Sequence, residues 1–130
     1  MPRAGVLVSL AAASLAAAVF AACGGPTSPD VIVDPIHIDS VDVVVGARIP
    51  ATVEVHVRGV VGDGCSTARP EQQTRAGNTV TITILRQRPR DAVCSQLARL
   101  YDERFALDGT FPPGSYLVVV NNLERGFPVP

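Results

Sequence analysis

Apolar and polar residues alternate along several short stretches of the chain, a pattern typical of strands with one buried and one solvated face. In the clearest stretch, residues 51–58, the apolar positions are Ala51, Val53, Val55 and Val57. Residues 78–87 alternate in the same way, with Thr on the polar side, and residues 41–45 are a third such stretch. Because Val, Ile and Thr also favour extended backbone, pattern and propensity agree on strands here.

Turn residues bound the strands expected in the last quarter of the chain. An apolar run at residues 115–120 follows Pro112-Pro113-Gly114 and stops at Asn121-Asn122. Phe127 and Val129 predict a short edge strand. Residues 95–107 fit either a helix or a strand, and the lack of capping residues favours one or two short strands. Residues 59–77 are expected to form a loop.

Six to eight short strands and frequent turns over about a hundred residues predict an all-β fold, an antiparallel two-sheet sandwich of immunoglobulin-like type. The run from Pro112 to Asn121 resembles the closing strand of bacterial immunoglobulin-like modules, in which a Pro-Pro-Gly-x-Tyr turn precedes a strand ending in Val-Asn. The domain is expected to comprise residues 36–130. This resemblance implies a fold and no particular activity.

The start of the chain has the composition of a targeting segment. Arg3 precedes an apolar run at residues 6–22, and Ala21-Ala22-Cys23-Gly24 resembles the lipobox of bacterial lipoproteins. That resemblance implies a helical signal peptide at residues 1–22, lipidation of the Cys23 thiol and, given Gly24, delivery to the outer membrane. The alternative is an ordinary secretory signal with an incidental cysteine. Residues 23–35 are rich in proline and are expected to be an extended linker.

Cys65 and Cys94 remain once Cys23 is assigned to the lipid. In the oxidising space outside the inner membrane, two such thiols are expected to form a disulfide. The bond would close a loop of about thirty residues and stabilise the domain by about 3–4 kcal/mol in the chain-entropy model. The alternative, a redox or metal-binding pair, lacks both a Cys-x-x-Cys spacing and a nearby histidine.

Charge is unevenly distributed, although the formal net charge is only -1. Arg86, Arg88 and Arg90 recur with a period of two, which places them on one side of an extended strand as a candidate anion-binding group. The alternative is a solvated rim that prevents edge pairing. The carboxylates that precede them have no Arg between them and match no calcium-binding loop: Asp30, Asp34, Asp39 and Asp42.

Catalytic motifs are not found in this sequence. It contains no Gly-x-Ser-x-Gly elbow, His-Glu-x-x-His pair, phosphate-binding loop or dinucleotide fingerprint. His37, His56 and Ser66 have no partner placed by their spacing. Aromatic residues amount to 5% and Trp is absent, a poor stock for stacking on sugars or bases. We therefore expect no enzyme, no metal, no cofactor and no nucleic-acid partner.

These features predict a lipid-anchored, non-enzymatic binding or structural module of the bacterial cell envelope. The mature chain resembles uncharacterised envelope lipoproteins that carry one immunoglobulin-like domain. The expected location is the outer membrane, facing the periplasm or the cell surface, with an envelope protein or an anionic envelope component as partner. The alternative is an inhibitor of secreted proteases. Inhibitors of the chagasin type carry an Arg-Pro-Trp loop, where this chain has Arg88-Pro89-Arg90.

Overall fold

The computed structural model describes residues 30–130, and these residues form ten strands and no helix. The predicted all-β sandwich is confirmed, with more strands than expected. In chain order they are β1 (Val31–Pro35), β2 (His37–Val45), β3 (Val53–Gly62), β4 (Thr67–Ala68), β5 (Gln72–Ala76), β6 (Thr79–Thr83), β7 (Leu85–Pro89), β8 (Arg99–Ala106), β9 (Gly114–Val120) and β10 (Leu123–Val129). The signal peptide expected at residues 1–22, and Cys23, lie outside the described residues.

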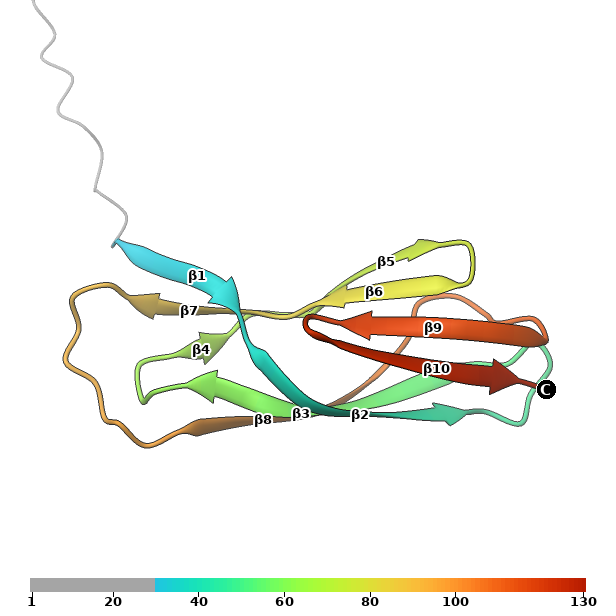
Figure 1. The fold of residues 1–130 in the computed structure, drawn as a ribbon, viewed down its shortest axis with the longest axis horizontal. Helices are drawn as coiled ribbons and strands as arrows, with labels where there is room; N and C mark the ends of the chain where they lie inside the picture. Colours follow the sequence, from blue (N-terminus) through green and yellow to red (C-terminus); the bar gives the residue numbers. More distant parts are fainter. Residues whose placement is uncertain (1–29) are drawn as a thin grey trace, which may run out of the picture.

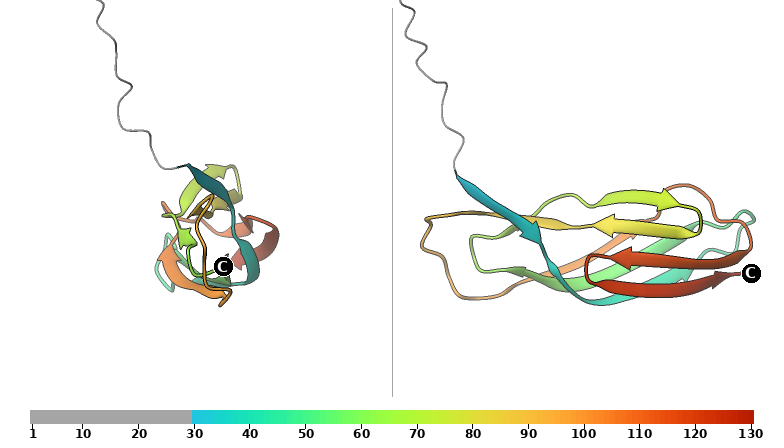
Figure 2. Two further views of the ribbon diagram at one scale, coloured as in Figure 1. Left: turned by 90° about the vertical axis from the view of Figure 1, so that its left-hand side faces the viewer. Right: turned by 45° about the horizontal axis from the view of Figure 1, so that its top comes forward.

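The strands form three sheets in an elongated molecule (Figure 1). One sheet has the order β2-β3-β8 and extends along much of the long axis. The other two, β1-β7-β4 and β10-β9-β6-β5, follow one another along that axis, as the right-hand view of Figure 2 shows. All pairs are antiparallel except β6 and β9, which pair in parallel with Thr79 opposite Leu117. The sandwich predicted from the sequence to be antiparallel therefore contains one parallel pair.

The strand expected at residues 78–87 is divided between two sheets. Residues 79–83 pair with β5 and β9, whereas residues 85–89 pair with β1 and β4. Ile84 lies at the break and is fully buried, and its carbonyl accepts a hydrogen bond from Ile36 N at 3.1 Å. Ile36 lies at the matching break between β1 and β2. The two chain segments thus change sheets side by side.

Three other boundaries differ from expectation. The linker predicted to reach residue 35 ends earlier, because residues 31–35 form β1 and pair with β7. The prediction of a single loop at residues 59–77 is wrong, since β3 continues to Gly62 and the strands β4 and β5 lie within this range. Residues 99–106 form a strand, β8, as favoured over a helix. The short edge strand predicted around Phe127 is the longer β10, paired with β9.

The core lies between the sheets and is built from the alternating apolar residues. Val53, Val55 and Val57 of β3 are buried, and they pack in one cluster with apolar side chains of β6 and β9. At one end the rings of Phe111, Tyr116 and Phe127 close this core, with centroids 5.1 to 6.1 Å apart. Burial of such apolar side chains is the main favourable term in folding.

The Pro-Pro-Gly-x-Tyr turn has a direct structural explanation. The Tyr116 hydroxyl donates a hydrogen bond of 2.6 Å to the Pro112 carbonyl, so the ring at the start of β9 fixes the turn that precedes it. Tyr116 also packs edge-on against Phe111. A buried tyrosine whose hydroxyl satisfies nearby backbone is a recurrent device in sandwich folds.

The first described residue and the C-terminus lie at opposite ends of the molecule. The described chain begins at Asp30, beside the loop of residues 90–98 that joins β7 to β8 (Figure 1). The opposite end, which we call the far end, holds the connections at residues 46–52, 77–78 and 107–113 and the C-terminus. Within residues 30–130, no helix is long and apolar enough to cross a membrane.

Candidate functional site

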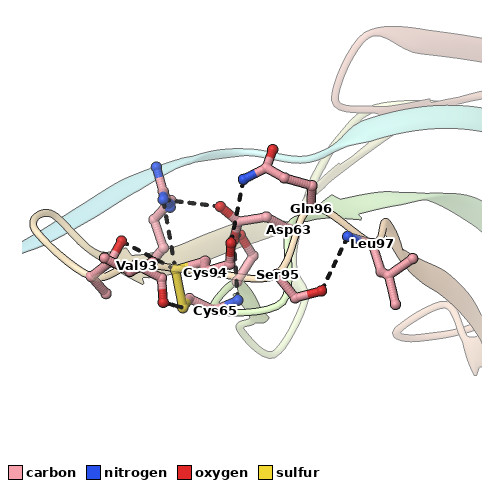
Figure 3. Close-up of a disulfide and its surroundings, with 10 residues drawn as sticks. Asp63, Cys65, Val93, Cys94, Ser95, Gln96 and Leu97 are labelled. Atoms are coloured by element: carbon pink, nitrogen blue, oxygen red, sulfur yellow. Dashed lines mark hydrogen bonds and ion pairs between the residues drawn. A yellow bond between two sulfur atoms is a disulfide. The ribbon is translucent and has the colours of Figure 1, made fainter.

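A disulfide joins Cys65 to Cys94, as predicted, and connects the turn after β3 to the loop before β8. The two Cα atoms are 5.4 Å apart and the residues are 29 positions apart in the chain. A backbone hydrogen bond from Gly64 N to Ser95 O, 2.8 Å, runs beside it. Residues 63–66 and 90–98 therefore form one cross-linked unit, which we call the disulfide end (Figure 3).

Asp63 organises the turn that carries Cys65. One of its carboxylate oxygens accepts hydrogen bonds from Cys65 N at 3.1 Å and from the buried Ser66 hydroxyl at 3.0 Å. The other oxygen lies 2.9 Å from Arg88 Nη2. Burial raises the pKa of this carboxyl, but the hydrogen bonds from Ser66 and Cys65 and the charges of Arg88 and Arg86 outweigh it, so the pKa falls below its usual range.

The three arginines predicted to bind an anion are already paired within the protein. Arg86 binds Asp34 through two hydrogen bonds, and Arg90 Nε lies 2.7 Å from Asp30 Oδ2. Arg88 pairs with Asp63, as described above. Two of the carboxylates thought to lack cationic neighbours are thus their partners. The Arg86–Asp34 and Arg90–Asp30 pairs therefore hold residues 30–35 against β7 and the residue after it, and with the Arg88–Asp63 pair they leave no open guanidinium cluster of these three residues.

Arg86 is the most firmly held of the three. Besides the Asp34 pair, its Nη1 donates to the Val61 carbonyl at 2.9 Å, so it connects β1, β3 and β7. The hydrogen bond to Asp34 raises the pKa of Arg86, and the same bond lowers the pKa of Asp34. Its role in this arrangement is structural.

The histidines are not assembled into a catalytic group. His56 of β3 contacts Asp102 of β8 on the outer face of the sheet, and this contact lowers the pKa of the Asp102 carboxyl. His37 is exposed, with Nε2 3.4 Å from Asp39 Oδ1. No group of three or more metal-ligating side chains occurs in residues 30–130. Ser66 is fully buried, and its hydroxyl donates a hydrogen bond to Asp63.

Several open grooves are present on the described part of the molecule, and two of these contain a histidine or a tyrosine in their lining. One, of about 520 Å³, lies where the chain changes sheets and is lined by residues 35–37, residues 81–83 and Asn121-Asn122. The other, of about 330 Å³, lies beside β8 and includes Glu71, Tyr101 and Glu103. Burial, followed by the charges of those two glutamates, raises the pKa of Tyr101 to about 12.

Several structurally important residues were missed from the sequence. Asn121 and Asn122 looked only like turn residues, yet their side chains bind the backbone of Ile36, Ile38 and Ile84. Asp63 looked like part of a Gly-Asp-Gly turn. A local signal was available for Asp63, because an Asp side chain in a turn often accepts a hydrogen bond from the backbone N–H two residues further on, here that of Cys65. No local signal identifies the long-range contacts of the asparagines.

The fold and the disulfide define a class: a single small β-sandwich domain. The ORF11 beta-sandwich domain model matches residues 55–129, from β3 to β10, and this chain belongs to that family. The chain is also similar to three uncharacterised 10.2 kDa proteins of Herpetosiphon aurantiacus. The one in the HgiCIIM 5′ region is 33% identical over 88 residues, covering 68% of this chain and 94% of the relative.

The relatives in the HgiBIM and HgiEIM 5′ regions are each 32% identical over 77 residues, which covers 59% of this chain and 94% of each relative. No solved structure matches the chain. These comparisons establish the domain family, and the names of the relatives specify no ligand or activity.

Proposed function

We propose that the protein is a lipid-anchored, non-enzymatic module of the bacterial cell envelope that presents the loops of its far end to an envelope protein. The observation that carries the proposal is the Cys65–Cys94 disulfide. It accounts for two of the three cysteines, and the third, Cys23, stands in the lipobox-like sequence Ala21-Ala22-Cys23-Gly24. A disulfide also fits an oxidising compartment outside the inner membrane.

The position of the chain entry supports a specific orientation. Asp30 is bound to Arg90 at the disulfide end, by the side chains and by Arg90 N donating to Asp30 O at 3.0 Å. An anchor attached upstream would therefore join the domain at this end, and the far-end connections lie at the opposite end of the described molecule (Figure 1). The most exposed apolar side chain of those connections is Ile49, at 87%. Exposed loops on a rigid scaffold commonly carry recognition.

The anionic partner considered from the sequence is less well supported than a protein partner. Arg86, Arg88 and Arg90 each have a carboxylate partner, so binding a phosphate there requires breaking an internal ion pair. The same pairs argue against the protease-inhibitor alternative, because Arg88-Pro89-Arg90 ends a paired strand and does not form an open loop. A cysteine-protease inhibition assay tests that alternative, and inhibition at stoichiometric concentration would favour it.

Anchoring is tested by producing the full chain in a bacterium supplied with an alkyne-tagged fatty acid. The wild-type protein is expected to carry the tag and to sediment with membranes, whereas the Cys23→Ser variant loses both properties. The matched control is the Cys65→Ala/Cys94→Ala double variant, which removes two thiols and is expected to keep the tag. Tagging that persists in Cys23→Ser, or a wild-type protein found only in the soluble fraction, would contradict the anchor.

Partner binding is tested with a photo-crosslinking amino acid placed singly at Ile49 or at Asp108, both in far-end connections, in cells that produce the anchored protein. A discrete crosslinked protein, identified by mass spectrometry, is expected from these positions. The control position is Glu124, an exposed residue of β10 outside those connections. Equal crosslinking from all three positions would indicate nonspecific proximity and would argue against recognition by the far end.

A further inference from the structure

Exposed apolar side chains gather near the disulfide end. Among residues 30–130, seven large apolar side chains are exposed, and five of them belong to β1, the loop of residues 90–98 and the start of β8: Val31, Val33, Val93, Leu97 and Leu100. Val93 is fully exposed, and Leu97 and Leu100 are 79% and 76% exposed. Exposed apolar side chains that gather at one end of a molecule are candidates for an interaction surface.

These side chains are held on a constrained loop. Cys94, the residue after Val93, is bonded to Cys65, and Ser95 O accepts the hydrogen bond from Gly64 N. Leu97 N donates to Ser95 Oγ at 3.3 Å. Figure 3 shows Val93 and Leu97 on opposite sides of the disulfide, with both side chains pointing away from it. The cross-link therefore presents the two apolar side chains and does not bury them.

The place where the described chain begins indicates what covers this surface. Asp30 is fixed beside Arg90, at the base of the same loop. From Cys23 to Asp30 there are seven peptide units, which reach at most about 25 Å when fully extended. Pairing of β1 with β7 thus uses up the last part of the linker expected from the sequence. A lipid on Cys23 would keep the disulfide end close to the bilayer.

We propose that the loop of residues 90–98 rests on the lipid bilayer and inserts Val93 and Leu97 into its interface, with Leu100 beside them. This inference rests on the proposed lipid anchor. The charged groups nearest the loop are largely balanced, since Arg90 pairs with Asp30 and Arg88 with Asp63, while Asp91 and Arg99 carry opposite charges. Insertion therefore depends on apolar contact and not on attraction to anionic headgroups.

The chain contains no Trp, which allows single reporters to be placed without background. The lipidated full chain, carrying either Leu97→Trp or Ile49→Trp, is reconstituted into phosphatidylethanolamine–phosphatidylglycerol vesicles that contain lipids brominated on their acyl chains. Both original side chains are exposed, so both variants are expected to unfold at the wild-type denaturant concentration. The Leu97→Trp emission is expected to shift to shorter wavelength and to be quenched by the bromines, with little change in high salt. The Ile49→Trp emission is expected to be unchanged.

The outcomes separate this inference from the anchor. Vesicle flotation without quenching at Leu97→Trp, or equal quenching at both positions, would overturn the inserted loop and leave the anchor intact. Failure of the wild-type protein to float with vesicles would overturn both. Quenching of Leu97→Trp that disappears in high salt would show binding to anionic headgroups and would contradict apolar insertion.

Discussion

Arg86 and Asp34, 52 positions apart in the chain, form a two-point ion pair with Nε–Oδ1 and Nη2–Oδ2 distances of 2.6 and 3.2 Å. The pair joins β7 to β1, and Arg86 also donates to the Val61 carbonyl of β3. This relationship makes residues 31–35 part of the folded domain. It also helps to explain why Arg86, Arg88 and Arg90, which occupy alternate positions in the sequence, do not form an open anion-binding site.

The first prediction concerns the strength of this pair. A double-mutant cycle with Asp34→Ala and Arg86→Ala is expected to give a coupling free energy of about 1–2 kcal/mol, since the pair is partly shielded and has two-point geometry. The measurement is chemical denaturation of the four proteins. The matched control is the Asp42–Arg58 pair, 2.7 Å apart and about half exposed, whose coupling is expected to stay below about 1 kcal/mol. Equal coupling in the two cycles would contradict a special role for Arg86.

The pH dependence of the first cycle follows from the lowered pKa of Asp34. A carboxyl with a folded-state pKa below its unfolded value of 3.8 contributes stability that is fully present above that value. The contribution is lost as pH falls through the folded-state pKa. The coupling free energy is therefore expected to be constant near neutral pH and to vanish in strong acid, and a constant coupling throughout would argue against the ion pair as its source.

The second prediction concerns the disulfide. In a Cys23→Ser background, the Cys65→Ala/Cys94→Ala protein is expected to lose about 3–4 kcal/mol of unfolding free energy, because the unfolded chain regains the entropy of a loop closed over 29 positions. Chemical denaturation measures the loss. Cys23→Ser alone is the control and is expected to leave the unfolding free energy unchanged. A double variant as stable as the control would contradict a stabilising role for the bond.

The third prediction concerns Asn121, whose φ of 49° places it in the left-handed region. Its amide accepts one hydrogen bond from Ile84 N and donates to the Ile36 and Ile84 carbonyls at 2.8 and 2.9 Å. Asn121→Gly keeps the backbone conformation and is expected to cost about 2–3 kcal/mol, at roughly 1 kcal/mol per lost bond. Asn78→Gly, which removes one exposed bond to Ser115, serves as the control and is expected to cost about 1 kcal/mol.

The fourth prediction concerns Gly59, which pairs with Ile38 beside a register shift in the antiparallel β2–β3 ladder. A Cβ at this position would lie 2.2 Å from the His37 carbonyl oxygen, so the two strands must separate to accommodate it. Gly59→Ala is expected to destabilise the protein by about 3 kcal/mol or more. In the control, Gly126→Ala, the nearest atom is 3.8 Å away, and the thermal unfolding midpoint is expected to change little. A tolerated Gly59→Ala would contradict the close approach of the two strands.

The fifth prediction concerns Tyr101, whose pKa is raised from 10.0 to about 12. Between these values the unfolded tyrosine releases a proton that the folded one keeps, so stability is fully present below pH 10 and falls as pH rises toward 12. The loss amounts to about 2 kcal/mol for a shift of this size. Tyr101→Phe is expected to be less dependent on pH in this range, as measured by denaturation at matched pH values. An identical alkaline slope in the two proteins would assign the effect to other groups.

Much of the fold follows from residues that alternate along the chain. Val53, Val55 and Val57 point into the core as predicted, because side chains on successive strand positions face opposite sides whatever the topology. The Pro112–Tyr116 turn and the end of the strand at Val120 were also recognised from local residues. Such features depend on backbone geometry within a few residues, which local sequence specifies.

The candidate site was predicted only in part. The pairing of Cys65 with Cys94 was inferred correctly, because only two cysteines remained for an oxidising compartment. The arginines were identified as a cluster, but their partners were missed. Asp34 and Asp30 reach Arg86 and Arg90 only because β1 lies beside β7, a pairing of segments more than fifty residues apart that alternation does not encode.

The sequence by itself determined which segments extend and which faces they bury, since both depend on residue type and local period, and the count of cysteines indicated which two form the disulfide. Tertiary structure alone decided that one long strand divides at Ile84 and that β6 runs parallel to β9. It also decided that Arg86 and Arg90 form ion pairs with the carboxylates of residues 30–34. Those outcomes depend on which edges meet in space. That choice is made by burial and backbone pairing across the whole domain, and no short stretch of residues specifies it.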